Sequence, residues 1–227
     1  MIHVPGNQGS AEWRLARMGI PTASRADALV TPAKWEPTKG DKRNAYMNEL
    51  IAERFAMLKT EQYKDDPQNR LEIIELNLNR YKSEAMAYGS ATEPQAVARY
   101  EFLTDKQTKE VGLVLNDERS AGASVDREIV GGNTGLEIKC PHSMGVYIGY
   151  CFDKSADREH MPQLQWQMWI CGYEAIEIYA YYPGMTQSEP IRVERDEEKI
   201  KRLAELHAEF WQALESRWQE WKDKISQ

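Results

Sequence analysis

The chain has 227 residues, of which 41% are hydrophobic, and its formal net charge is −7. This length and composition suit one α/β domain with a sizeable core, and the acidic balance argues against a uniformly basic surface for nucleic acid but does not exclude a local binding site. No apolar run approaches the roughly 18 residues that cross a bilayer, and the first residues lack a basic segment followed by an apolar one, so we expect a cytoplasmic protein without a signal peptide.

Helical patterns dominate the first hundred residues. Ser10 is a suitable N-cap for a short helix that Gly19 ends, and a second helix is expected directly afterwards. A longer amphipathic pattern follows, and then a polar stretch over residues 59–70 is typical of an exposed loop. Gly89 and Pro94 are expected to interrupt the next helical pattern. The predicted helices cover residues 9–19, 22–30, 41–58 and 71–102.

Short segments rich in β-formers follow, each bounded by Gly, Asn, Asp or Pro. One helical segment lies among them, and a long amphipathic helix comes last. The predicted strands cover residues 110–117, 121–126, 134–140, 175–183 and 189–195, and the predicted helices cover 161–172 and 197–221. This order predicts an α/β fold with a mixed central sheet flanked by helices, in a single domain over residues 1–227. Its parts are a helical region at about 10–103, a sheet core at about 109–195 and a C-terminal helix at about 196–222.

Two charged residues lie in a predicted strand that otherwise reads as buried. Glu137 and Lys139 are two residues apart, so they project from one face of the sheet while Ile138 turns toward the core. Asp126 lies at the end of the preceding predicted strand. The glycine-rich turn between the two strands indicates an antiparallel hairpin that brings Asp126 close to Glu137. Two carboxylates and one ammonium should therefore converge on one spot.

Such a group suits a divalent cation, because two close carboxylates repel each other and a bound Mg²⁺ relieves that repulsion. The Ile138 carbonyl is the natural backbone ligand beside Asp126 and Glu137. Lys139 would hold or activate the attacking water beside the metal and offset charge in the transition state. The pattern D-(x)n-E-x-K is short, however, and taken alone it is equally consistent with a salt bridge on an exposed strand face.

The segments SVD, residues 124–126, and GLEIKCP, residues 135–141, resemble the core of the PD-(D/E)xK nucleases. They most resemble the phage-encoded family typified by lambda exonuclease, also called the YqaJ-like viral recombinase family, although Val125 replaces the proline of the motif. Three further blocks resemble the family in the same order. These are W-x3-R-x-G-x-x-T-A-S at residues 13–24, G-x3-E at residues 89–93, and a Q-x-Q helix with Gln163 and Gln165.

The resemblance implies a catalytic role for each matching acidic or basic residue of the core. Asp126, Glu137 and the backbone carbonyl of Ile138 would be the metal ligands, and Lys139 would position the nucleophilic water. Glu93 would be an additional acidic member of the catalytic group. This chemistry agrees with the oxygen ligands that Mg²⁺ prefers.

The resemblance also implies a binding site for the DNA end. Arg17, Ser24 and Gln163 match positions that bind the 5′-phosphate in the family, and Met86 falls near the family's apolar wedge that separates the strands. The residue types suit these roles, since arginine offers a planar fork of donors to phosphate and a serine hydroxyl can donate beside it.

The implied protein is a metal-dependent deoxyribonuclease with a restriction-endonuclease-like core, using Mg²⁺ with Mn²⁺ as a substitute. It would degrade one strand of linear double-stranded DNA in the 5′→3′ direction from a 5′-phosphorylated end, leaving a 3′ single-stranded overhang for phage-type homologous recombination. The resemblance further implies a ring-shaped homotrimer, a single-strand annealing protein as partner, and the cytoplasm of a bacterial host of a phage or prophage, with no membrane role.

Two alternatives stay open at this point. One is a related PD-(D/E)xK nuclease that acts as an endonuclease or with a different end polarity. The other is a non-catalytic protein that binds DNA ends during recombination. The number of metal ions, one or two, is also open.

Other chemistry-bearing residues are expected to be structural. A lone histidine such as His142 or His160 is not needed as a base when a metal activates water. Trp166 and Trp169 have helical spacing within an apolar segment, which favours the core. The three cysteines of the chain form no C-x-x-C pair and are expected to be reduced thiols.

Overall fold

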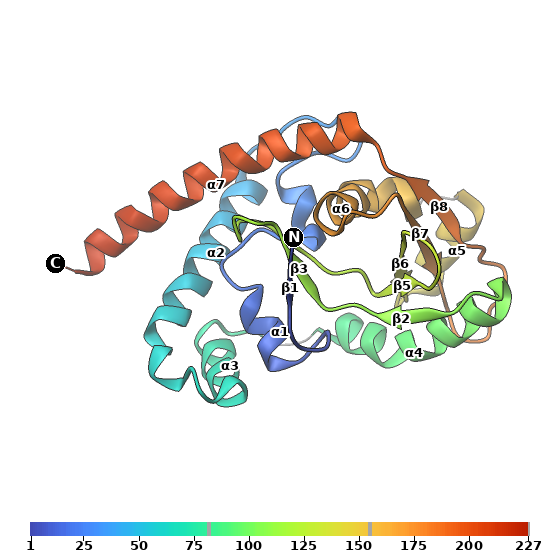
Figure 1. Ribbon diagram of the computed structural model, residues 1–227, viewed down its shortest axis with the longest axis horizontal. Helices are drawn as coiled ribbons and strands as arrows, with labels where there is room; N and C mark the ends of the chain where they lie inside the picture. The colour runs from blue at the N-terminus through green and yellow to red at the C-terminus, as the bar shows by residue number, and fades with distance from the viewer. Residues whose placement is uncertain (81–82, 154–155, 227) are drawn as a thin grey trace.

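The computed structural model describes residues 1–80, 83–153 and 156–226. It contains a mixed sheet of five strands flanked by helices, and a second sheet of three strands (Figure 1). The helices are α1 Ala11–Ala16, η1 Ala23–Ala28, α2 Asp41–Lys59, η2 Glu61–Tyr63, α3 Pro67–Asn77, α4 Glu84–Thr104, α5 Met144–Asp153, α6 Ala156–Cys171 and α7 Glu197–Ile225. The strands are β1 Ile2–Val4, β2 Thr108–Glu110, β3 Leu113–Leu115, β4 Gly122–Ala123, β5 Arg127–Ile129, β6 Thr134–Lys139, β7 Ala175–Ala180 and β8 Ile191–Glu194. The predicted mixed sheet flanked by helices is confirmed.

The strand β6 is the centre of the five-stranded sheet, whose order is β2-β5-β6-β7-β8. It pairs antiparallel with β5 and parallel with β7, and the outer pairs are antiparallel. The parallel pair is joined by a crossover that contains α5 and α6, as parallel strands require a long connection. Every residue of β6 from Thr134 to Ile138 is buried, so a charge in this strand needs a partner.

Different helices cover the two faces of β6. Leu136 and Ile138 join the buried cluster that includes Tyr100 of α4. Glu137 and Lys139 point to the opposite face, where both bond to a side chain of α6. The alternation predicted along this strand is therefore confirmed, and it puts the two charges between the sheet and α6.

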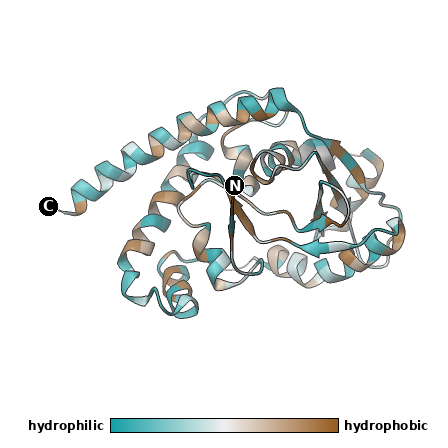
Figure 2. Cartoon of the chain, in the orientation of Figure 1, coloured by the Kyte–Doolittle hydropathy of each residue, from teal (hydrophilic) through white to brown (hydrophobic). Residues whose placement is uncertain are grey.

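A second core lies between α2, α6 and α7. Trp166 of α6 is fully buried there with Leu50 of α2 and Phe210 of α7, which confirms its predicted place in the core. Figure 2 shows hydrophobic residues recurring along the otherwise hydrophilic α7, and Figure 1 shows the C-terminal turns of this helix extending beyond the other elements. No helix in the described ranges is both long and apolar enough to cross a membrane.

The three-stranded sheet, in the order β1-β3-β4, brings the N-terminal motif to the central sheet. Trp13 of α1 packs against Leu113 and Leu115 of β3. A backbone bridge links Thr22 to Gly122 of β4. The segment that follows α1 therefore lies beside the connection from β4 to β5, which carries Asp126.

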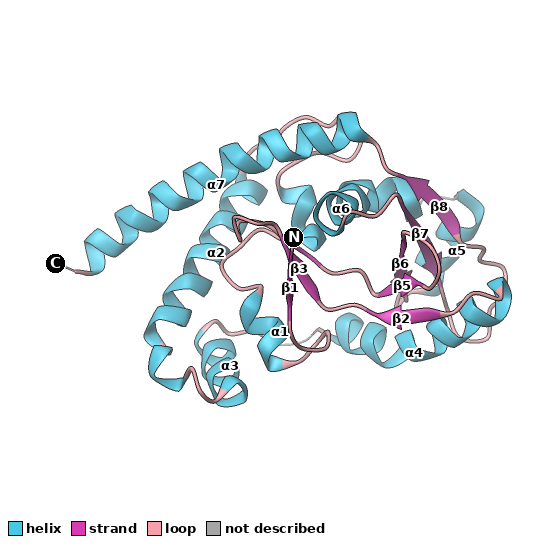
Figure 3. Cartoon of the chain, in the orientation of Figure 1, coloured by secondary structure: helices cyan, strands magenta, loops and turns pink. Residues whose placement is uncertain are grey.

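Gly89 and Pro94 do not interrupt their helix, contrary to the sequence-based expectation. The helix α4 runs through both without a break, and Figure 3 shows it as one continuous ribbon. Its buried residues Thr92, Ala96 and Tyr100 form a stripe that packs against the sheet. This packing outweighs the lost backbone hydrogen bond at Pro94, which is exposed on the outer side.

Other expectations need smaller corrections. The predicted loop at residues 59–70 contains η2 and the start of α3, which Asp66 caps. The segment after Gly19 forms the 3₁₀-helix η1 and not an α-helix. The strand expected at 121–126 is reduced to the short β4, and α5 was not expected at all.

Candidate active site

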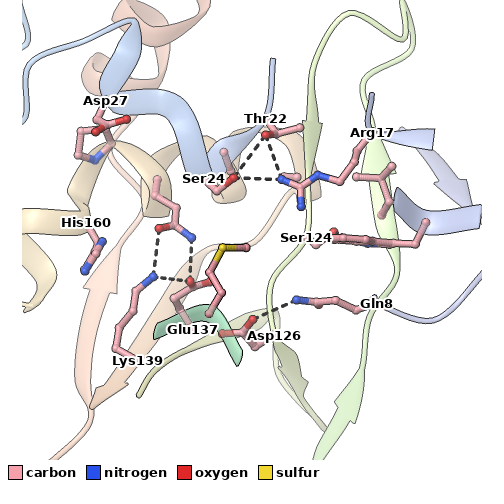
Figure 4. Close-up of a pocket in the computed structure, with 17 residues that line it drawn as sticks. Gln8, Arg17, Thr22, Ser24, Asp27, Ser124, Asp126, Glu137, Lys139 and His160 are labelled. Carbon is pink, nitrogen blue, oxygen red and sulfur yellow. Dashed lines mark hydrogen bonds and ion pairs between the residues drawn. The ribbon is translucent and has the colours of Figure 1, made fainter. Parts of the chain in front are cut away.

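A cavity of about 690 Å³ opens between the N-terminal segment, the β5–β6 hairpin and the start of α6. Figure 4 shows Arg17, Thr22 and Ser24 on one side of it, with Glu137 and Lys139 on another. The residues predicted for the site that line this one cavity are Arg17, Ser24, Met86, Asp126, Glu137, Lys139 and Gln163. Residues from widely separated parts of the sequence thus face a common space.

The β5–β6 hairpin holds Asp126 beside β6, although not as the strand-end residue that was expected. Asp126 lies just before β5, whose ladder with β6 begins at Arg127 opposite Leu136. Beyond this pair, Asp126 Oδ2 accepts the N–H of Ile138 at 2.7 Å. Because the N–H and C=O of one strand residue point to the same edge, the Ile138 carbonyl faces the strand edge on which Asp126 lies.

Glu137 is only 4% exposed, and both of its carboxylate oxygens are held. Its Oε1 accepts hydrogen bonds from Lys139 Nζ at 2.8 Å and Gln163 Nε2 at 2.7 Å. Its Oε2 accepts one from Gln167 Nε2 at 2.7 Å. The side chain of Lys139 is 20% exposed, so this ion pair lies in the wall of the cavity and is not the exposed strand-face salt bridge of the simpler interpretation.

Burial and neighbouring negative charges raise the pKa of two carboxylates of the site, Asp126 and Glu93. Burial raises the pKa of Asp126 well above its usual value, and the charges of Glu137 and Glu93 raise it further. Burial and the Glu137 charge also raise the pKa of Glu93. Burial lowers the pKa of Lys139, but the Glu137 carboxylate outweighs it, and the pKa of Lys139 is raised. Lys139 is therefore an ammonium at neutral pH, held against the Glu137 carboxylate.

This donor set fits a hard divalent cation. Two carboxylates and a backbone carbonyl are oxygen ligands that Mg²⁺ accepts, with waters completing its shell. Burial is the largest cause of the raised pKa of Asp126, and the charges of Glu137 and Glu93 add to it; a bound cation would offset both effects. Within the described parts of the chain, no group of three or more His, Cys, Asp or Glu side chains is arranged to hold a metal. The Ile138 carbonyl and waters would have to supply the ligands beyond Asp126 and Glu137.

Arg17, Thr22 and Ser24 form the opposite wall. Arg17 Nη2 donates to Thr22 Oγ1 at 3.2 Å and to Ser24 Oγ at 3.1 Å. The guanidinium lies over the ring of Trp13, 4.5 Å from its centroid. A planar cation that is stacked in place beside two hydroxyl groups is suited to a phosphate.

The glutamines of α6 divide between two faces of the helix. Gln163 and Gln167 are four residues apart and both donate to Glu137. Gln165 faces away, where its Nε2 donates to the Glu194 carbonyl at 2.9 Å and its Oε1 accepts from the Asp196 N–H at 3.0 Å. The Q-x-Q pattern thus joins one residue of the site to one structural residue. Gln167 was missed, although its i, i+4 spacing from Gln163 was a signal for a shared face.

Three residues lie at the edge of the site. Glu93 is not among the described residues that line the cavity, and it acts on Asp126 through its charge. Met86 lines the cavity and is 62% exposed. His160 also lines it, and burial, followed by the Lys139 charge, lowers the pKa of His160 to about 4. Its imidazole is therefore neutral at neutral pH, and it lies within 3.2 Å of the Tyr150 hydroxyl.

Two further polar contacts had no signal in the sequence. Gln8 Nε2 donates to Asp126 Oδ1 at 3.3 Å. Trp13 Nε1 donates to Ser124 Oγ at 3.0 Å. The partners are 118 and 111 residues apart in the chain, respectively, so only the tertiary fold brings them together.

Comparison with known proteins identifies a family and several related structures. A family model described as the YqaJ-like viral recombinase domain matches residues 12–174. An alkaline exonuclease from Laribacter hongkongensis is similar in structure, with a TM-score of 0.76, 28% identity, and 96% of this chain and 98% of that chain covered. Its complex with dAMP gives a TM-score of 0.77 at 27% identity over the same shares.

A phage related exonuclease from Haemophilus somnus has a TM-score of 0.60 at 13% identity, over 87% of this chain and 96% of that chain, which is a likeness of fold alone. No curated protein matches the chain in sequence. The structural likenesses confirm the predicted α/β fold class, and the family match covers most of the chain and the two walls of the cavity. The chain belongs to the YqaJ-like viral recombinase family.

Proposed function

We propose that this protein is a Mg²⁺-dependent exonuclease that degrades one strand of linear duplex DNA in the 5′→3′ direction. It starts from a 5′-phosphorylated end and leaves a 3′ single strand for phage-type homologous recombination. The observation that carries the proposal is one cavity with phosphate-type donors on one wall and a carboxylate–ammonium group on the other. Membership of the family and the 28% identity to an alkaline exonuclease support it.

The donor wall recognises the end of the DNA. Arg17 presents its planar N–H donors to the terminal phosphate, and the hydroxyl groups of Thr22 and Ser24 donate beside it. The stacked Trp13 ring limits the motion of the guanidinium. Holding the terminal phosphate here brings the next phosphodiester toward Asp126 and Glu137, which is catalysis by positioning.

The acidic wall performs the hydrolysis. Asp126, Glu137 and the Ile138 carbonyl would hold the cation, with Glu93 adding negative charge nearby. A bound Mg²⁺, or Mn²⁺ in its place, would supply Lewis-acid chemistry for the scissile phosphate and the attacking water. Lys139 keeps its proton because its pKa is raised. It orients the attacking water and offsets the charge that develops on the phosphate.

Gln163 and Met86 complete the proposal. Gln163 bonds both Glu137 and Lys139, so it fixes the pair relative to α6 while its position also matches the phosphate-binding residues of the family. Met86 is apolar, exposed and at the cavity, as a residue that separates two DNA strands should be. Family resemblance supports a ring-shaped homotrimer, a single-strand annealing partner and a phage or prophage origin in a bacterial cytoplasm.

Digestion of end-labelled linear duplex DNA tests this function. With Mg²⁺, a duplex with a 5′-phosphate should be degraded about tenfold faster, or more, than the same duplex with a 5′-hydroxyl, which is the contribution of one charge-assisted contact. Label at the 5′ end should be released first. Chelation of the metal should stop the reaction, and added Mg²⁺ should restore it.

Three results would each contradict a part of the proposal. Equal rates on 5′-phosphate and 5′-hydroxyl ends would contradict the proposal that Arg17 recognises the terminal phosphate. Early release of a 3′ label, or cutting of closed circular DNA, would support the alternative of another polarity or an endonuclease. Tight binding to ends without cleavage in any divalent metal would support a non-catalytic protein.

A further inference from the structure

Gln167 is a buried amide that contacts two parts of the proposed active site. Its side chain is fully buried. Its Nε2 donates to the backbone carbonyl of Ser124 at 2.8 Å and to Glu137 Oε2 at 2.7 Å. Its Oε1 is buried too, and among the described residues no group donates a hydrogen bond to it.

This arrangement fixes the orientation of the amide. Rotating it by half a turn would put Oε1 against the Ser124 carbonyl and the Glu137 carboxylate, which are both acceptors. The observed orientation uses both hydrogens of the Nε2 group and leaves the oxygen unpaired, which is unfavourable in a buried place. An apolar side chain would fill the same space without this cost, so packing alone does not explain a glutamine here.

The two contacts of Gln167 join the segments that carry the two carboxylates. Ser124 is two residues before Asp126, and its hydroxyl accepts from the Trp13 ring on which Arg17 is stacked. Glu137 belongs to β6. One amide therefore links the Asp126 segment to the Glu137 strand, and Gln163, one turn earlier on α6, holds the other oxygen of Glu137.

We propose that Gln167 is a positioning residue, which fixes the Glu137 carboxylate relative to the Asp126 segment so that the two can share one divalent cation. This inference rests on the proposed function and adds a residue to it. A neutral donor suits the role. A lysine or arginine would compete with the cation for Glu137, whereas an apolar residue would leave Oε2 without a partner and free to turn.

The test compares Gln167→Met with the matched control Gln165→Met. Both glutamines are buried in the same helix, two residues apart, and each uses its Nε2 on a backbone carbonyl. Of these two glutamines, only Gln167 also bonds Glu137. Calorimetric titration of Mg²⁺ or Mn²⁺ into the DNA-free protein measures metal affinity directly. Steady-state digestion of 5′-phosphorylated duplex gives kcat and KM.

Gln167→Met should weaken metal affinity by about 10- to 100-fold, the usual effect of losing a partner of a metal ligand. Its kcat should fall while KM for the DNA end stays within a factor of about two, since Arg17 and Ser24 are unchanged. Gln165→Met should lower thermal stability but keep the metal affinity and kcat of the wild type. If Gln167→Met does not fold, Gln167→Asn keeps an amide that is one methylene shorter and should show the same loss.

Unchanged metal affinity and kcat in a folded Gln167 variant, beside an active wild type, would overturn the positioning role and leave the proposed function standing. Equal losses in Gln167→Met and Gln165→Met would show a structural effect of α6 only, which also overturns it. A wild type that neither binds Mg²⁺ nor cleaves DNA would overturn both proposals together.

Discussion

The donor wall depends on the shape of one side chain as much as on its charge. Arg17 reaches two hydroxyl groups through a single nitrogen and rests its flat face on Trp13. The remaining N–H groups of a guanidinium point outward in a fixed plane, which matches the oxygens of a phosphate. Lysine carries the same charge on a flexible stem and has neither the plane nor the stack.

Arg17→Lys should therefore reduce recognition of the DNA end more than it reduces activity on a 5′-hydroxyl end. The rate advantage of a 5′-phosphate should fall by about 10- to 100-fold, which corresponds to the loss of hydrogen bonds to a charged group. Initial rates on matched duplexes measure this advantage. Arg14→Lys is the control, because Arg14 lies in α1, whose C-cap is Arg17, but pairs with Glu75. An undiminished preference in Arg17→Lys would exclude Arg17 from the phosphate site.

The alternation of residues in a strand was enough to predict the shared face of Glu137 and Lys139. The same is true of the hairpin that brings Asp126 to them, since each depends on local periodicity and a glycine-rich turn. The residues that contact this group were harder to predict from the sequence. The Gln8–Asp126 and Trp13–Ser124 contacts each join residues more than a hundred positions apart in the chain.

At the scale of elements, errors occurred where packing overrides local propensity. The helix α4 continues through Gly89 and Pro94 because its buried stripe packs on the sheet. The helix α5 contains Gly145 and Gly149 and exposes apolar residues such as Phe152, so neither propensity nor an amphipathic pattern predicts it. The long helices α2, α6 and α7 were predicted well because their apolar residues repeat with helical spacing.

The helix α7 also carries a buried titratable group. His207 is 5% exposed, its Nε2 lies 2.9 Å from the Ser120 carbonyl, and Trp166 and Trp169 contact its ring edge-on. Burial lowers the pKa of His207 below its ordinary value of 6.5, and the Ser120 carbonyl and the Glu118 charge oppose this only in part. The neutral ring is thus the form that fits the packed helix.

Protonation of His207 should favour the unfolded state. The stability that this residue contributes should be complete above about pH 6.5 and should fall as the pH drops from there toward its lowered folded pKa, by about 1.4 kcal/mol per pH unit at most. Thermal unfolding from pH 7.5 to 5 measures this slope. His207→Gln should flatten it, whereas His3→Gln, at an exposed position, should not. An identical slope in His207→Gln and the wild type would assign the acid sensitivity to other groups.

At the scale of the whole molecule, the net charge of the protein and the charge of its proposed DNA substrate are both negative. The chain carries −7, and every phosphate of a duplex is repelled by that charge at long range. Binding must then come from local sites, and the donor wall of Arg17, Thr22 and Ser24 is the local site that the cavity provides. An end with a terminal phosphate can enter this cavity, whereas the middle of an uninterrupted duplex cannot offer a terminal phosphate to it.

Closed circular duplex DNA should therefore be a poor competitor. The assay measures how two unlabelled competitors inhibit digestion of a labelled linear duplex. Linear DNA with a 5′-phosphate should inhibit at a concentration on the order of tenfold lower than a circle of the same sequence needs. This difference is the effect of one charge-assisted terminal contact. Raising the salt concentration should weaken the circle's effect little, because the basic residues that line the cavity, Arg17 and Lys139, are those proposed to act on the end of a strand. The initial rate of label release measures both. Equal inhibition by the two competitors, with a steep dependence on salt, would show that a basic surface along the duplex dominates binding and that recognition of the end does not.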